Sequence, residues 1–148
     1  MGKYGEKAKG LFLEGYNCAQ AVFGAFSDVT GIDFETSVKL SSGFGGGMGR
    51  MREVCGAVSG MFMVLDAIEG YTSPTDNTAK MEHYAKVQEL AEKFKRETCS
   101  IICRELLDGE QSSTPLPSER TAEYYTKRPC GELVEIAADI VAEHLCLK

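Results

Sequence analysis

Apolar side chains recur along most of this chain every three or four residues, which is the spacing of one face of an α-helix. The first stripe predicts one helical unit over residues 3–27, which Gly31 ends, and it consists of Phe12, Tyr16, Ala19, Phe23 and Phe26. Asp33 is a suitable N-cap for a short helix that ends at Ser41 and Ser42. No segment alternates apolar and polar residues over the length of a strand, so the pattern favours a helical protein.

The middle of the sequence predicts two longer helices. The first ends at Gly70, and its apolar face consists of Val54, Val58, Met61, Leu65 and Ile68. The second, over residues 77–97 with Asp76 as its cap, mixes Met81, Tyr84, Ala91 and Phe94 with Lys and Glu residues. This mixture is typical of an amphipathic surface helix, and we expect His83 on its polar face. His144, among the last residues, is also expected at the surface.

The last third of the chain predicts shorter elements and a final helix. Residues 98–107 are expected to continue helical, or to restart after a bend, and to end at Gly109. Ser118 can cap a short helix through Tyr125. Pro129 suits the first turn of the final helix, whose inward side consists of Leu133, Val134, Ala137, Ile140 and Val141.

These elements predict an all-α, single-domain bundle of five or six helices over residues 1–148. A chain of 148 residues is long enough to build a core without disulfides. Residues 111–118, with two prolines among Ser and Thr, have the composition of a linker but are too short to separate domains.

Charge and hydropathy narrow the class of protein. The net charge of −6 offers no basic surface for phosphate backbones, which argues against nucleic acid as a partner. The acidity favours solubility, or steering toward a basic partner protein. The longest apolar run, residues 61–65, is far shorter than the roughly 20 residues that span a bilayer. Because residues 1–10 are charged and do not resemble a signal peptide, we expect a cytoplasmic protein.

The six cysteines are the candidate functional residues. Cytoplasmic thiols are kept reduced, and they serve as metal ligands or redox groups more often than as structural disulfides. Cys55 is expected in a first helical turn, where free N–H groups favour the thiolate, so it is the candidate catalytic residue of a thiol redox protein. Cys130 occupies the matching place after Pro129. The alternative for Cys55 is a small buried residue of the core.

The positions of the other cysteines argue less strongly for a functional role. Cys18 is expected in the middle of the first helix and partly inward, where packing alone is an alternative reason for it. Cys99 and Cys103, four residues apart, are expected as neighbours on one helix face, and either can reach a shared site. Cys146 lies off the inward stripe and is expected to have no role.

A glycine-rich segment precedes Cys55: residues 43–49 contain five glycines in seven positions, which predicts a loop. We expect Gly45, Gly46 and Gly47 to let the backbone pass close to a cofactor, with N–H groups aimed at its sulfurs. Phosphate binding is an alternative, but the loop lacks the phosphate-binding lysine motif, and Arg50 and Arg52 are its nearby cations.

Four segments of the chain resemble the C_GCAxxG_C_C family of redox-active proteins, and the resemblance spans most of the sequence. They are Tyr16-Asn17-Cys18-Ala19-Gln20, the glycine loop with Cys55-Gly56-Ala57-Val58-Ser59-Gly60, Cys103-Arg104-Glu105-Leu106-Leu107, and Pro129-Cys130-Gly131-Glu132-Leu133-Val134. The resemblance implies that the family's four cysteines are Cys18, Cys55, Cys103 and Cys130. The family's name spells Gly-Cys-Ala, whereas the order in this chain is Cys-Gly-Ala.

Three functions follow as hypotheses. The first is electron transfer to a redox partner protein through an iron–sulfur cluster held by Cys18, Cys55, Cys103 and Cys130, since modules related to the family look like iron–sulfur carriers. The second is a thiol–disulfide redox enzyme or sensor that uses Cys55 and holds no metal. The third is a zinc-stabilised binding module with the same four cysteines. Each leaves room for a site that a homodimer shares.

Overall fold

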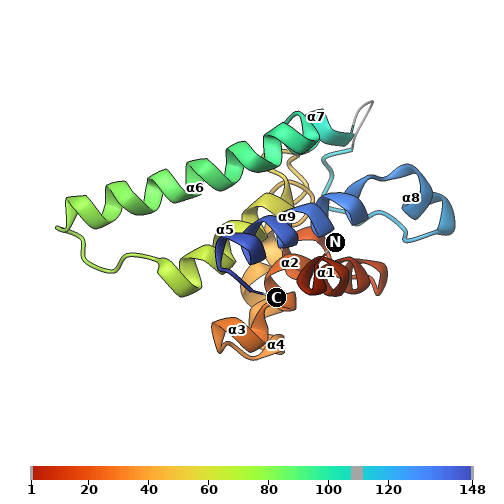
Figure 1. Ribbon diagram of the computed structural model, residues 1–148. Helices are drawn as coiled ribbons and strands as arrows, with labels where there is room; N and C mark the ends of the chain where they lie inside the picture. The colour runs from red at the N-terminus through yellow and green to blue at the C-terminus, as the bar shows by residue number, and fades with distance from the viewer. Residues whose placement is uncertain (1, 108–111, 148) are drawn as a thin grey trace.

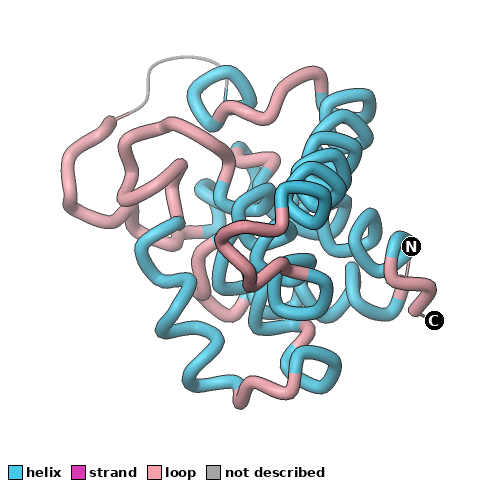
Figure 2. Tube along the Cα trace, turned by 90° about the vertical axis from the view of Figure 1, so that its left-hand side faces the viewer, coloured by secondary structure: helices cyan, strands magenta, loops and turns pink. Residues whose placement is uncertain are grey.

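The computed structural model describes residues 2–107 and 112–147 of the chain. These residues form nine α-helices and one short 3₁₀ helix, and within them no strand occurs (Figures 1 and 2). In chain order the helices are α1 (Lys3–Leu13), α2 (Cys18–Ala25), α3 (Ser27–Thr30), α4 (Phe34–Ser41), η1 (Ser42–Phe44), α5 (Gly56–Glu69), α6 (Asn77–Thr98), α7 (Cys103–Leu107), α8 (Ala122–Lys127) and α9 (Cys130–His144). The predicted all-α class is confirmed. The nine helices exceed the predicted five or six because several predicted units are divided.

The core lies where α1, α2, α5 and α9 pack on one another. Their fully buried side chains include Phe12, Phe26, Met61, Leu65, Val134 and Val141. The long helix α6 lies along the outside of this group, against α5 and α9. Helix α8 lies on the side of the molecule far from the N-terminal end of α6, and its Tyr124 and Tyr125 pack against the core (Figure 1). No helix within the described ranges has the length and apolar character needed to cross a membrane.

The predicted single helical unit over residues 3–27 is wrong in one respect, because it is broken between α1 and α2. Gly15 has a φ of +113°, and Asn17 then caps α2. The Asn17 side chain accepts a hydrogen bond from the N–H of Gln20 at 2.9 Å, and the Gln20 side chain accepts one from the N–H of Asn17 at 3.1 Å. This capping box starts a new helix at Cys18, which therefore lies at a helix N-terminus and not in mid-helix.

Three predicted helix boundaries are confirmed at α3 and α4. Gly31 ends α3 with a left-handed φ of +78°. Asp33 caps α4, and its carboxylate accepts a hydrogen bond from the N–H of Thr36 at 3.0 Å. The helix ends at Ser41, as the pattern predicts.

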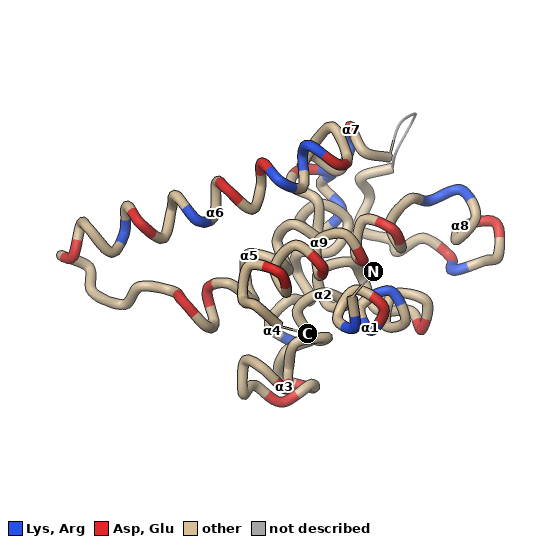
Figure 3. Tube along the Cα trace, viewed as in Figure 1, with Lys and Arg blue, Asp and Glu red and all other residues tan. Residues whose placement is uncertain are grey.

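The buried face of α6 differs from the predicted one. Asp76 caps the helix as expected, and acidic and basic residues alternate along it (Figure 3). The face toward the core holds Leu90 and Phe94 but continues to His83, which is only 5% exposed, while Met81 and Tyr84 are 65% and 51% exposed. The prediction of a surface His83 is therefore wrong, because its Nε2 lies 2.6 Å from Oδ1 of Asp66 on α5.

Other details of the second half also depart from the sequence pattern. His144, expected at the surface, is half-buried with its Nε2 3.2 Å from Glu69. Helix α6 ends at Cys99, which has a left-handed φ of +78°, so Cys99 and Cys103 do not share a helix face. The cap of α8 is Thr121 and not Ser118. The predicted stop at Gly109 lies outside the described residues.

Candidate functional site

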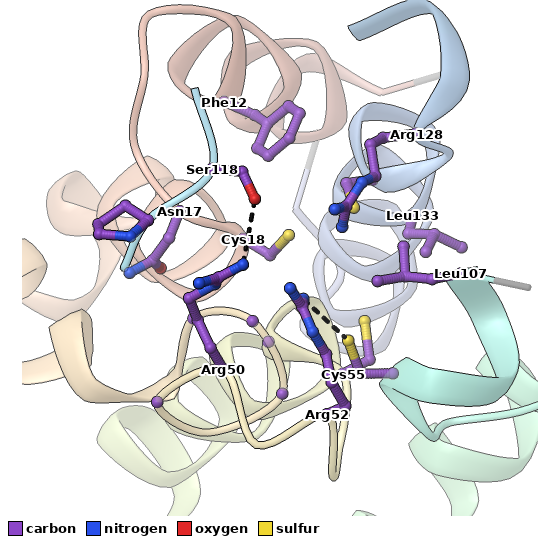
Figure 4. A pocket seen from close by; sticks show the side chains of 18 of the residues that line it. Phe12, Asn17, Cys18, Arg50, Arg52, Cys55, Leu107, Ser118, Arg128 and Leu133 are labelled. Atoms are coloured by element: carbon purple, nitrogen blue, oxygen red, sulfur yellow. Dashed lines mark hydrogen bonds between the residues drawn. The ribbon is translucent and has the colours of Figure 1, made fainter. Parts of the chain in front are cut away.

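Four cysteines line one cavity of about 420 Å³, and each lies at the start of a different helix (Figure 4). Cys18, Cys103 and Cys130 are the first residues of α2, α7 and α9, and Cys55 is the N-cap of α5. A helix start carries unpaired N–H groups and the positive end of the helix dipole. The fold therefore brings four sulfurs and four partially positive helix ends to the same cavity.

Backbone hydrogen bonds join the segments that carry Cys55 and Cys103. The N–H of Cys55 donates to the carbonyl of Ile101 at 2.8 Å, and the N–H of Cys103 donates to that of Glu53 at 2.6 Å. Between them Val54 and Ile102 form an isolated antiparallel bridge. This short pairing fixes the two cysteines beside each other although no strand was predicted or found in the described ranges.

Two glycines of α5 bring Cys18 close to Cys55. A Cβ at Gly60 would lie 2.9 Å from the carbonyl oxygen of Ala19, so α2 and α5 are in backbone contact there. A Cβ at Gly56 would lie 3.1 Å from Cβ of Cys18 and 2.9 Å from the carbonyl of Phe44. Side chains at these two positions would push the cysteine-bearing helix starts apart.

The glycine-rich segment forms a compact loop that faces the cavity with Gly45, Gly46 and Gly47. Gly46 and Gly47 have left-handed φ angles of +65° and +72°. A Cβ at Gly47 would lie 2.6 Å from Cβ of Cys103, and a Cβ at Gly45 would lie 2.4 Å from the Asn17 side chain. The glycines thus allow the loop to approach Cys103 and Asn17 closely, and the cavity wall is backbone at these positions.

Comparison with known proteins identifies one family. Residues 16–144 match the family described as "Putative redox-active protein (C_GCAxxG_C_C)". The chain belongs to this family. Among curated proteins and solved structures, none matches the chain.

The cavity of this C_GCAxxG_C_C protein is strongly basic. Four of the six arginines of the chain line it, namely Arg50, Arg52, Arg120 and Arg128, whereas no lysine, aspartate or glutamate of the described residues does. Sequence reasoning identified Arg50 and Arg52 only as cations near the loop and missed the other two. No periodic pattern marks these arginines, since they come from the glycine loop and from the segments around α8.

The four guanidinium groups are held in different ways. Arg50 donates to the carbonyls of Thr114 and Leu116 and to the hydroxyl of Ser118, so it is fixed to the segment 112–118 that covers part of the cavity. Arg52 donates from Nε to the carbonyl of Ser112 at 3.1 Å and from Nη1 to Sγ of Cys103 at 3.8 Å (Figure 4).

Aromatic rings hold the other two arginines. Arg120 donates to the carbonyls of Phe12 and Tyr16, and its guanidinium lies over the rings of Phe12 and Tyr124. The guanidinium of Arg128 lies 5.1 Å from the centre of the Tyr124 ring. Such stacking keeps a guanidinium in place at the edge of a buried site.

Cys18 and Cys130 form a pair in which one sulfur has thiolate character. A hydrogen bond from Cys18 lowers the pKa of Cys130 to about 7, and the charges of Arg128, Arg120 and Arg52 act in the same direction. The same hydrogen bond, with burial, raises the pKa of Cys18 well above the usual range of a thiol. Cys130 is therefore the most readily ionised of the four sulfurs.

Cys55 does not have the lowered pKa that its helix start predicts. Its side chain is buried, with 4% exposure, and burial raises its pKa to about 12, although the N–H groups of Ala57 and Val58 oppose the shift. Burial also raises the pKa of Cys103, against the hydrogen bond and charge of Arg52. For these two thiols desolvation outweighs the helix start.

The remaining candidates separate clearly from the site. Cys99 and Cys146 are exposed, have left-handed φ angles and do not line the cavity. Within residues 2–107 and 112–147, no three His, Cys, Asp or Glu side chains are close enough together to hold a single metal ion. Cys18, Cys55, Cys103 and Cys130 line the cavity, and the number and softness of their sulfurs suit a polynuclear iron–sulfur group.

Proposed function

We propose that this protein transfers electrons through an iron–sulfur cluster held by Cys18, Cys55, Cys103 and Cys130. The observation that carries the proposal is that four helix starts, each bearing one of these cysteines, meet at a single cavity. The cysteines are far apart in sequence, so their meeting is a property of the whole fold. Membership of a family described as redox-active supports the same reading.

The surroundings of the sulfurs fit an anionic group. Thiolates and cluster sulfides together carry net negative charge, and the lining supplies four arginines without a carboxylate from the described residues. Gly46 and Gly47 place no side chain in the cavity. A Cβ at Gly47 would lie only 2.6 Å from Cβ of Cys103, so a larger residue does not fit there. The four neighbouring cations repel one another, and an anionic group among them would offset that repulsion.

A cluster held by these four cysteines would supply one-electron chemistry, and the chain would control its environment. Cys55 and Cys103, whose pKa values burial raises, must give up protons when they become ligands, so loading releases protons to solvent. The apolar side chains of Leu106, Leu107 and Leu133 complete the wall and limit the access of water. A redox partner protein supplies or removes the electron, and a reducing cytoplasm keeps the thiols free for the metal.

The arrangement favours a cluster over the zinc alternative. A structural zinc ion needs four ligands within about 2.3 Å for sulfur. Because no three candidate ligands of the described residues gather around one point, a zinc site would require the helix starts to move together. A cluster would need more room between its ligands than a single ion, and a cavity of about 420 Å³ supports this choice.

The proposal is tested by anaerobic reconstitution with iron and sulfide, followed by elemental analysis and visible spectroscopy. We expect brown protein with iron and acid-labile sulfide in the parent, and loss of both in Cys18→Ser, Cys55→Ser, Cys103→Ser and Cys130→Ser. Cys146→Ser and Cys99→Ser are the matched controls, since both residues are exposed outside the cavity. Stoichiometric zinc without sulfide, or a Cys55→Ser variant that loads as the parent does, would contradict the proposal.

The pair of Cys18 and Cys130 favours a second candidate, a thiol–disulfide oxidoreductase. The Cys130 thiolate would attack one sulfur of a substrate disulfide and release the other as a thiolate; Cys18 would then attack Cys130, forming their disulfide and releasing the reduced substrate. The lowered pKa of Cys130 supports it, and it reassigns the attacking role from Cys55. Metal-free protein that reduces a disulfide substrate, with loss of activity in Cys130→Ser but not in Cys55→Ser, would favour this candidate.

A further inference from the structure

Arg52 is the most buried of the arginines at the cavity. Only 6% of the residue is exposed, and its guanidinium points into the cavity toward the cysteines (Figure 4). Long charged side chains are rarely buried to this extent unless a charged or polar partner is present. The residue is therefore a candidate for a specific interaction with whatever the cysteines hold.

We propose that Arg52 sets the reduction potential of the cluster, as a buried cation hydrogen-bonded to one ligand sulfur. The inference rests on the proposed function. Its geometric basis is the hydrogen bond that Nη1 of Arg52 donates to Sγ of Cys103 at 3.8 Å. Hydrogen bonds to ligand sulfurs are one of the means by which a protein tunes an iron–sulfur potential.

The backbone around Arg52 holds this side chain in place. Its φ of +62° is left-handed, an uncommon conformation for a residue with a side chain. Its Nε donates to the carbonyl of Ser112, and its own carbonyl accepts hydrogen bonds from the N–H of Arg104 at 3.3 Å and from Nη1 of Arg104 at 3.2 Å. Since Arg104 follows Cys103 directly, the same contacts fix the donor and the sulfur relative to each other.

The other arginines at the cavity have different partners. Arg50 is bound to the segment 112–118, and Arg120 donates to carbonyls near the end of α1. Arg128 lies over the Tyr124 ring. Within the described residues, Arg52 is the arginine that donates a hydrogen bond to a cysteine of the site.

The direction of the effect follows from charge. Reduction adds one electron, supplied in the test by dithionite, and no proton is required, so the site becomes one charge more negative. Part of that charge lies on the ligand sulfurs, where a nearby buried cation stabilises it more than it stabilises the oxidised state. Arg52 therefore raises the potential, and its removal makes the cluster harder to reduce.

The test compares reconstituted parent protein with Arg52→Met, which removes the charge and the donor while keeping an unbranched side chain. The measurements are iron and sulfide content, then an anaerobic dithionite titration followed by visible absorption. We expect Arg52→Met to load and its equilibrium constant for reduction to fall at least tenfold, which is about 59 mV for one electron. Arg52→Gln, which is neutral but can still donate to Ser112, should show a fall in the same direction and serves if Arg52→Met does not fold.

Controls separate the failure of this inference from the failure of the proposed function. Arg96→Met removes an equal charge from the exposed surface of α6, where solvent screens it. The equilibrium constant for reduction of this variant should stay within about twofold of that of the parent. Loaded Arg52→Met, or loaded Arg52→Gln, with the parent's potential would overturn the role of Arg52 while leaving the cluster intact. Parent protein that takes up no iron or sulfide would overturn the proposed function and this inference together.

Discussion

Cys18 and Cys130 lie at one cavity and shift each other's pKa in opposite directions, although one residue lies near the beginning of the chain and the other near its end. Both are first residues of helices, α2 and α9, which pack against each other in the core. The pair therefore forms only when the two ends of the fold are assembled, and it gives the site one sulfur, that of Cys130, with a pKa of about 7.

This pair predicts a pH-dependent reaction of the metal-free protein. Only the thiolate reacts with a small alkylating reagent, so the rate at Cys130 should rise with pH, with a midpoint near its pKa of about 7, and then level off. Cys55, with a pKa of about 12, should stay nearly unreactive over the same range. Mass spectrometry of digested protein at several pH values measures both rates.

The hydrogen bond itself can be tested by Cys18→Ala. Because it is the largest cause of the lowered pKa of Cys130, its loss should move the midpoint of alkylation upward, toward that of an ordinary thiol. Cys146→Ala, at an exposed cysteine outside the cavity, should leave the midpoint in place. An unchanged midpoint in Cys18→Ala would mean that the arginines alone lower the pKa.

A second prediction concerns the glycine loop. Gly47→Ala should lower the free energy of unfolding by at least about 1 kcal/mol, since alanine is strained at a left-handed φ. The added Cβ would also lie 2.6 Å from Cβ of Cys103, so cluster loading should fall. Gly10→Ala is the control, because no atom lies within 4 Å of a Cβ there. In helix α1 that change should stabilise the protein by about 0.5–1 kcal/mol and leave loading unchanged.

The sequence predicts the helical class and part of the site for clear physical reasons. Apolar periodicity identifies the buried face of α9 and part of that of α5, where Val58, Met61 and Leu65 are buried but Ile68 is 40% exposed, against the prediction. Pro129 and the glycine loop indicate that Cys130 and Cys55 start helices. The pattern does not reveal that Cys18 also starts a helix. The signal for it is present in Asn17 and Gln20, whose side chains form the capping box, but a continuous apolar stripe across the break conceals it.

The rest of the site depends on tertiary contacts that local patterns do not encode. The charge of Arg52 is visible in the sequence, but its burial depends on the packing of the loop against Ser112 and Cys103. His83 shows the same limit. Its polar side chain suggests a surface position, but it is buried beside Asp66 of another helix, whose carboxylate lies within hydrogen-bond distance of its Nε2. The pKa of Cys55 is similarly decided by burial, which a helix position alone does not give.

A third prediction tests whether the capping box positions Cys18. Asn17→Ala removes the hydrogen bond to the N–H of Gln20 and the one that Nδ2 donates to the carbonyl of Ser42 at 3.1 Å. It should cost about 1 kcal/mol of unfolding free energy and also reduce cluster loading. Asp33→Ala, at the cap of α4 away from the cavity, should cost a similar amount without reducing loading. Equal loading in the two variants would show that the cap serves stability alone.

A final prediction concerns the segment 112–118, which Arg50 ties to the glycine loop. Arg50 reaches the carbonyls of Thr114 and Leu116 and the hydroxyl of Ser118, and these charge-assisted bonds lie beside the cavity. In Arg50→Met the segment loses these contacts, so limited proteolysis of the metal-free protein should cut it several-fold faster. Where a cluster has been loaded, an iron chelator should also remove it faster, because the segment no longer covers that side of the site. Arg96→Met instead removes a charge from the exposed surface of α6, away from the cavity, and should change neither rate by more than about twofold. If the proteolysis rate rises in Arg50→Met while chelation does not, the segment does not shield the cysteines, and access to them must run past another part of the wall.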